Sequence, residues 1–236
     1  MMPDAVVTYA ADWSEYFGHQ PADGSGDVFY HLDPLWASPS IDVVGIDNYL
    51  PLADRRDDEL GEDAAPSDYD VPALRAGIAG GEYFDWYYAS DADRAAGLRT
   101  PITDGAAGKP WVFRPKDIAG WWSNPHVERR GGIETAGTSP WLPMSKPIWF
   151  TELGCPAINR GPNQPNVFVD PKSSESFVPH ASAGGRDDLV QRWFLEAQLG
   201  FWDPASPDFD AANNPLSPVY GGRMVNAAAI HLCALM

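Results

Sequence analysis

The hydrophobic positions of this 236-residue chain fall into short continuous runs rather than alternating patterns. Four runs predict β-strands, at residues 5–10, 41–46, 147–151 and 228–232. A fifth, weaker strand is predicted at residues 111–113, within a long irregular stretch. Because strands covered on both faces are apolar at successive positions, these runs indicate a parallel sheet.

Amphipathic helical patterns lie between the strands. Residues 187–202 place their large apolar side chains on one stripe, with Gly184 and Gly185 before the pattern and Pro204 after it. Shorter patterns predict three more helices, at residues 27–36, 70–79 and 83–98. Strands that alternate with helices predict an α/β fold with parallel strands, and no linker divides the chain into domains.

Composition and charge narrow the possible functions. The chain is 44% hydrophobic and 12% aromatic, enough to form a core and to exclude intrinsic disorder. It has 16 Lys and Arg against 33 Asp and Glu, a net charge of −17. Phosphate backbones and anionic lipids would repel such a surface, so nucleic acid is not an expected partner. The longest apolar run, residues 227–236, is shorter than the roughly 20 residues of a membrane span, so no membrane insertion is expected.

Residues with distinctive chemistry do not form a cofactor or metal motif. The two cysteines, Cys155 and Cys233, are expected to be buried free thiols, with a structural bridge as the less favoured alternative. The five histidines lack metal-ligand spacing and are expected to be solvated, as is the charged run at residues 55–59. No phosphate-binding glycine loop follows a strand, so we expect no cofactor and no metal. The first residues lack a signal-peptide pattern, which predicts cytoplasmic synthesis.

Acidic residues stand at the carboxyl ends of three predicted strands. Asp12 follows the first strand, Asp47 the second and Glu152 the third. Trp13 and Tyr49 stand close by in the sequence. Carboxylates can act as nucleophile or proton donor at an anomeric carbon, and aromatic rings can cover the apolar faces of a sugar. The alternative is that these carboxylates cap loops or pair with arginines.

Three segments resemble strands of clan-A-type glycoside hydrolase barrels. They are SKPIWFTELGCP at residues 145–156, DVVGIDNYLPL at 42–52 and VTYAADW at 7–13, which match strands seven, six and five. More closely, the whole chain resembles the glycoside-hydrolase TIM-barrel-like domain of the large baseplate (tail tip) protein of gene transfer agents and related tailed phages. Further segments carry this resemblance, at residues 81–90, 109–114, 121–126 and 163–172.

The resemblance implies a (β/α)8 TIM-barrel-like fold, with residues 1–236 as one domain. A closed barrel requires eight strands, and the chain has four or five strand patterns. We therefore expect roughly strands five to eight with long loops, the C-terminal portion of a larger barrel and a larger polypeptide. In such barrels the general acid/base is a glutamate at the end of strand four, which this chain is expected to lack.

The resemblance also implies roles for individual residues. Glu152 would be the nucleophile or would stabilise an oxocarbenium-like transition state, and Asp47 would orient the sugar, tune Glu152 or serve as its partner. The expected substrate-binding residues are Asp12, Trp13, Asn48, Tyr49, Arg114, Trp121, Trp122, Asn163 and Gln164. For Trp121 and Trp122 the alternative is packing beneath a loop, and for Asn163 and Gln164 it is stabilisation of a loop.

Two functions of different classes remain open at this stage. One is a glycosidase that cuts a cell-envelope polysaccharide, located in the tail of a phage-like particle. The other is a carbohydrate-binding or structural baseplate domain without catalysis, and a free-standing inactive remnant is a weaker third. The expected partners are the polysaccharide and either other tail proteins or the rest of a larger polypeptide.

Overall fold

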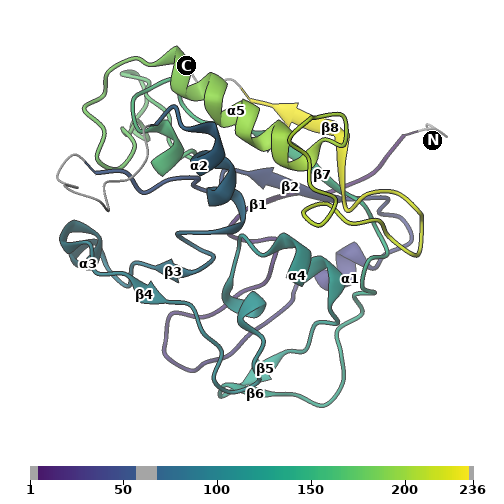
Figure 1. The fold of residues 1–236 in the computed structure, drawn as a ribbon. Helices are drawn as coiled ribbons and strands as arrows, with labels where there is room; N and C mark the ends of the chain where they lie inside the picture. The colour runs from purple at the N-terminus through teal and green to yellow at the C-terminus, as the bar shows by residue number, and fades with distance from the viewer. Residues whose placement is uncertain (1–4, 57–67, 234–236) are drawn as a thin grey trace.

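A parallel sheet lies at the centre of the protein, whose computed structural model describes residues 5–56 and 68–233 (Figure 1). Its strand order is β1-β2-β7-β8. The strands are Ala10–Asp12 (β1), Val44–Asn48 (β2), Ile148–Leu153 (β7) and Val225–Leu232 (β8). The α/β class with parallel strands is therefore confirmed. Within the described ranges the sheet is open, with β1 and β8 at its edges, and no barrel closure is seen.

Helix α5 (Asp188–Trp202) packs against this sheet and beside α2 (Val71–Ala76), as Figure 1 shows. The Asp187 side chain caps α5 by accepting from two backbone N–H groups of its first turn. The buried face of α5 reaches β7, where the Trp202 and Phe150 rings meet edge to face at 5.5 Å. The predicted helix at 187–202 is confirmed. So is the one at 70–79, whose last turn is the 3-10 helix η1 (Gly77–Ala79).

A second packed region is formed largely by the long connection between β2 and β7. It contains α1 (Asp33–Trp36), α4 (Ile118–Ser123), and the pair β5 (Arg129–Arg130) and β6 (Ile133–Glu134). His126 lies fully buried at its centre, between the stacked rings of Tyr30 and Trp141. Its two ring nitrogens face the Asp33 carboxylate and the Trp121 carbonyl, each at 2.8 Å. The expectation that His126 is solvated was wrong, because aromatic packing shields it from water.

Several predicted element boundaries were wrong. Residues 111–113 belong to a 3-10 helix, η2 (Pro110–Phe113), instead of a strand. Proline fits the first position of a helix, where its missing N–H has no partner to lose. The first strand begins at Ala10 instead of residue 5, since Val7 bonds to the Asp42 side chain and Thr8 donates its hydroxyl to the Val43 carbonyl.

Two predicted helices are much shorter than their patterns. Of residues 83–98, only α3 (Asp91–Ala96) is helical, and Trp86–Tyr87 (β3) pairs with Thr100–Pro101 (β4). Of residues 27–36, only α1 is helical, because Val28 and Phe29 form isolated bridges with Arg129 and His19. In both cases pairing with residues distant in the sequence outweighs the local pattern.

Cys155 is buried, Cys233 is half-buried, and both are free. Burial raises the pKa of the Cys155 thiol far above its usual range. Among the described residues, no helix has the length and apolar character needed to cross a membrane.

Candidate active site

The three predicted strand-end carboxylates lie in one row across the sheet. Asp12 on β1 pairs with Asp47 on β2, and Asp47 pairs with Glu152 on β7. A register shift after Ile46 brings Glu152 opposite Asp47, where regular pairing would have placed Thr151. Because paired residues of neighbouring parallel strands project to the same side, the sheet register itself assembles this group.

Tyr49 holds Glu152 in place. Its hydroxyl donates to Oε2 of the exposed Glu152 side chain at 2.5 Å. Burial raises the pKa of Tyr49 far above its usual range, and contacts with Cys233 and Glu152 raise it further. The hydroxyl therefore stays a donor at physiological pH, and it orients one carboxylate oxygen of Glu152. The Tyr49 ring was expected to stack on a sugar, but the residue is only 9% exposed, which leaves little ring surface for stacking.

Asp47 differs from Glu152 in its surroundings. It is half-buried and accepts a hydrogen bond of 2.7 Å from the Thr151 hydroxyl. Burial raises the pKa of Asp47, the Thr151 bond opposes this, and the charges of Glu152 and Asp12 raise it further. The surroundings of Asp47 thus disfavour its charged form relative to a free aspartate.

Asp12 and Asn48 have structural partners. The Asp12 side chain accepts from the Ser14 backbone N–H at 2.8 Å and from the Ser14 hydroxyl at 2.5 Å, so it caps the turn after β1. Asn48 is buried and accepts from the Leu50 N–H at 3.3 Å. Asp12 therefore fits the loop-capping alternative, although it remains exposed beside Asp47.

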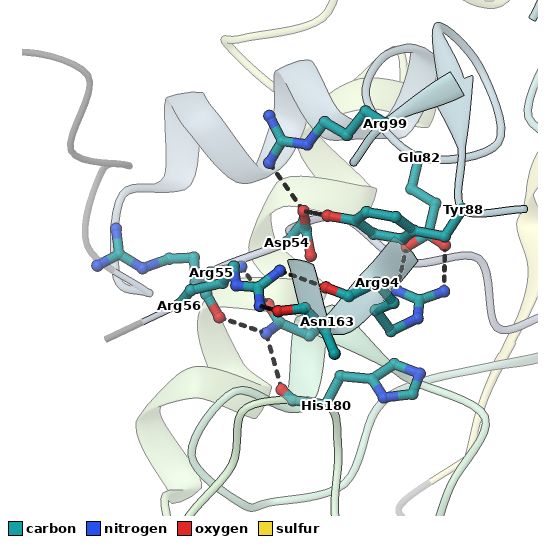
Figure 2. Close-up of polar contacts among 10 residues, drawn as sticks. Asp54, Arg55, Arg56, Glu82, Tyr88, Arg94, Arg99, Asn163 and His180 are labelled. Atoms are coloured by element: carbon teal, nitrogen blue, oxygen red, sulfur yellow. Dashed lines mark hydrogen bonds and ion pairs between the residues drawn. The ribbon is translucent and has the colours of Figure 1, made fainter. Parts of the chain in front are cut away.

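Three other predicted binding residues meet in one cleft next to the strand ends. Trp13, Asn163 and Gln164 line this cleft of about 80 Å³ together with Glu82, Tyr83, Arg94 and His180. Asn163, from η3 (Gly161–Asn163), is buried, and its amide donates to the carbonyls of Arg55 and His180 at 2.8 and 2.9 Å (Figure 2). Asn163 thus joins two loops, which is the stabilising role given as its alternative.

Trp121 and Trp122 do not present free faces to a ligand, and Arg114 is half-buried. Trp121 and Trp122 are 1% and 0% exposed, and the Trp122 indole donates to the Lys146 carbonyl at 2.8 Å. The packing alternative therefore describes both tryptophans, and the expected stacking role does not fit their burial. The Arg114 guanidinium lies over the Phe84 ring at 4.8 Å.

The cleft also contains residues that sequence reasoning missed. Arg94 forms two hydrogen bonds with the buried Glu82, at 3.1 and 2.5 Å. Beside them, Asp54 accepts from the Tyr88 hydroxyl at 2.6 Å and from Arg99 at 2.8 Å (Figure 2). Glu82 lies in a segment that carries the family resemblance, but no spacing pattern connects it to Arg94.

The charged run at residues 55–59 is only partly described. Arg55 and Arg56 are half-buried, which corrects the expectation that they are solvated. The Arg55 side chain contacts Asp68 at 3.1 Å, and Arg56 donates to the carbonyls of Arg94 and Ala95. Residues 57–59 lie outside the described part of the chain. In that described part, no group of three or more His, Cys, Asp or Glu side chains is arranged to hold a metal ion.

The described residues form an α/β fold with a parallel sheet of four strands, and the class of protein comes from a comparison with known families. This is a TIM-barrel-like domain, and a family model described as "GTA TIM-barrel-like domain" matches residues 1–235. The chain therefore belongs to the GTA TIM-barrel-like domain family, which associates it with gene transfer agents. A search of curated proteins finds no match.

Proposed function

We propose that this domain serves a gene transfer agent as a glycoside hydrolase of the tail baseplate, acting on cell-envelope polysaccharide with Glu152 as nucleophile. The observation that supports this most directly is the row of carboxylates, in which Tyr49 donates to Glu152 at 2.5 Å. The Tyr49 bond engages one oxygen of Glu152 and leaves the other for the anomeric carbon. The family match supports the association with the particle.

In this proposal Asp47 is the partner of Glu152. Asp47 and Glu152 are register partners on neighbouring strands. A retaining pair requires its two carboxyls to lie about 5–5.5 Å apart. Burial and the charge of Glu152 raise the pKa of Asp47, and Glu152 accepts the hydrogen bond from Tyr49. Asp47 would protonate the leaving oxygen while Glu152 attacks.

A non-catalytic role is the second candidate function. In the described residues the sheet is open at β1, so no further strand covers Asp12 and supplies another acid on that side. A domain of this kind would bind the same polysaccharide, or only its neighbours in the baseplate, without cutting it.

Replacing Glu152 tests the nucleophile assignment. Envelope polysaccharide is incubated with the wild type and with Glu152→Gln, and new reducing ends are measured. We expect the variant to be slower by on the order of a thousandfold, because a neutral amide cannot form the glycosyl-enzyme bond. Glu175→Gln is the matched control, since Glu175 is exposed on a loop and should keep the wild-type rate.

Two outcomes would contradict this assignment. Equal rates from the wild type and Glu152→Gln would remove Glu152 as nucleophile. Binding of the polysaccharide by both proteins, without new reducing ends from either, would favour the non-catalytic role.

A further inference from the structure

We infer that the loops beside the strand ends form an extended groove that binds several neutral sugar units of a polysaccharide. This inference rests on the proposed function for the identity of the polymer class, but not for its hydrolysis. Its centre is the cleft lined by Trp13, Tyr83, Gln164 and His180.

The cleft has lining residues in common with two larger cavities. It shares Arg94, Asn163 and His180 with a cavity of about 450 Å³. On another side it shares Tyr83 with a cavity of about 610 Å³, whose walls include Phe17. Sites for small ligands typically measure about 300–1,000 Å³, so this succession of spaces suits an oligomer better than a single small molecule.

Aromatic side chains form one part of the groove. The Trp13 and Tyr83 rings lie 5.3 Å apart with an interplanar angle of 49°, and both are half-buried. Trp13 directly follows Asp12 at the end of β1, which connects the groove to the row of carboxylates. Further along, Tyr87 and Phe113 line the larger cavity. Such rings present apolar faces of the size of a sugar ring.

Unengaged polar side chains face the same space. Gln164, Asn166 and His180 line the cleft, and their side chains form no hydrogen bond with another described residue. Burial lowers the pKa of His180, as does the charge of Arg94, so the ring is neutral at pH 7. A neutral imidazole and two amides each offer both a donor and an acceptor, which matches the hydroxyl groups of a sugar.

Two arginines at the groove already have carboxylate partners, which favours a neutral ligand. Arg94 is paired with Glu82, and Arg99 is paired with Asp54. These cations already have carboxylate partners, and the chain as a whole carries a net charge of −17. An acidic sugar would therefore meet no uncompensated cation at these pairs and would be repelled by the surrounding surface.

Backbone strain occurs at two positions along the groove. Among the described non-glycine residues, four have positive φ, and two of these, Tyr83 at 66° and Ala181 at 59°, line the groove cavities. Such conformations cost about 1–3 kcal/mol each and persist where the surrounding structure enforces them, often at ligand sites. At Tyr83 this conformation sets the direction of the ring that faces Trp13.

Binding is tested on the Glu152→Gln protein, so that hydrolysis does not remove the ligand. The probes are cellotetraose and chitotetraose as neutral chains and tetragalacturonate as an acidic chain, measured by titration calorimetry. We expect a neutral tetrasaccharide to bind at least tenfold more tightly than tetragalacturonate. Adding Trp13→Ala should weaken neutral binding tenfold or more, because a stacking face is lost.

A second variant is chosen so that misfolding cannot account for a loss of binding. Gln164→Ala combined with Asn166→Ala changes only side chains without hydrogen bonds among the described residues, so it should keep the fold while weakening binding severalfold. Phe177→Ala is the matched aromatic control, since Phe177 is 64% exposed and should leave binding unchanged.

The results separate this inference from the proposed function. Three results would contradict binding of neutral sugars in the groove. They are tighter binding of tetragalacturonate, no binding of either neutral chain, and neutral binding that neither groove variant weakens. If the groove variants weaken binding but the wild type releases no reducing ends, the groove inference stands and the proposed hydrolase activity is contradicted.

Discussion

Lys116 lies buried beneath the turn that carries Glu82 and Tyr83. Its Nζ donates to the Gly77 and Gly80 carbonyls at 2.8 and 2.9 Å. Burial lowers the pKa of Lys116 to about 7, although the charges of Glu82 and Asp85 act in the opposite direction. A neutral amine has two N–H groups, and the two carbonyls satisfy both of them.

This burial predicts a pH-dependent stability. The folded pKa of Lys116 is about 7 and its ordinary value is 10.5, so between these values the unfolded state binds more protons. The free energy of unfolding therefore rises with pH across this window, by about 1 kcal/mol per pH unit. Lys116→Met should lack this contribution. Denaturant unfolding of both proteins from pH 6 to 10 measures the difference.

Lys172→Met is the control, because Lys172 is exposed and its variant should follow the wild-type pH profile. Parallel profiles for the wild type and Lys116→Met would show that Lys116 has no such linkage.

Residue types alone predicted part of the candidate site. Asp47 and Glu152 stand out because each is an acid directly after an apolar run. The hydrogen bond from Tyr49 to Glu152 joins residues 103 positions apart, so no local pattern contains it. The Arg94–Glu82 pair and the burial of His126 depend equally on how the loops pack.

At the scale of elements, strand register is the feature that assembles the site. β1 can pair closely with β2 because Gly45 has no side chain. A Cβ at Gly45 would lie 2.5 Å from the Tyr9 carbonyl oxygen and 2.9 Å from the Thr8 hydroxyl. The close approach of β1 thus positions Asp12 opposite Asp47.

Gly45→Ala should separate β1 from β2. We expect a loss of stability of about 1–3 kcal/mol, typical of overpacking, because the added methyl group meets backbone. Gly105→Ala is the matched control, since a Cβ there meets nothing within 4 Å. Urea unfolding of the three proteins gives the comparison, and equal midpoints for Gly45→Ala and Gly105→Ala would contradict this account.

The amphipathic patterns predicted a helix correctly where that helix packs along its full length on the core. The stripe at 187–202 does so in α5, but the aromatic residues of 83–98 contact different neighbours. Trp86 pairs in β3, and the Tyr88 hydroxyl reaches Asp54. The helix α3 begins only after Ser90, whose side chain accepts from the Asp93 N–H.

At the scale of the whole molecule, the excess of negative charge is the dominant property. With a net charge of −17, repulsion among surface carboxylates opposes the compact state. The ion pair of Arg129 and Asp104 is buried, with both side chains 2% exposed, so salt screens it little.

Moderate salt should therefore stabilise the protein. Raising NaCl from about 10 to about 200 mM shortens the screening length from about 30 Å to less than 10 Å. We expect Tm to rise by about 2–4 °C, equivalent to about 1 kcal/mol for a chain of this size. Differential scanning calorimetry measures the shift, with sucrose at equal osmolarity as the control. A lower Tm in salt would mean that surface ion pairs outweigh the repulsion.

The sequence by itself determined the α/β class, the family, the long helix and the acids at three strand ends. These features follow from local periodicity and from residue types at fixed offsets, which do not depend on distant contacts. Only the tertiary structure decided that Asp12, Asp47 and Glu152 form one row, that Tyr49 binds Glu152, and that Trp13 faces Tyr83. Such contacts depend on strand register and loop packing between distant segments. That the four strands correspond to strands five to eight of a barrel stays a prediction.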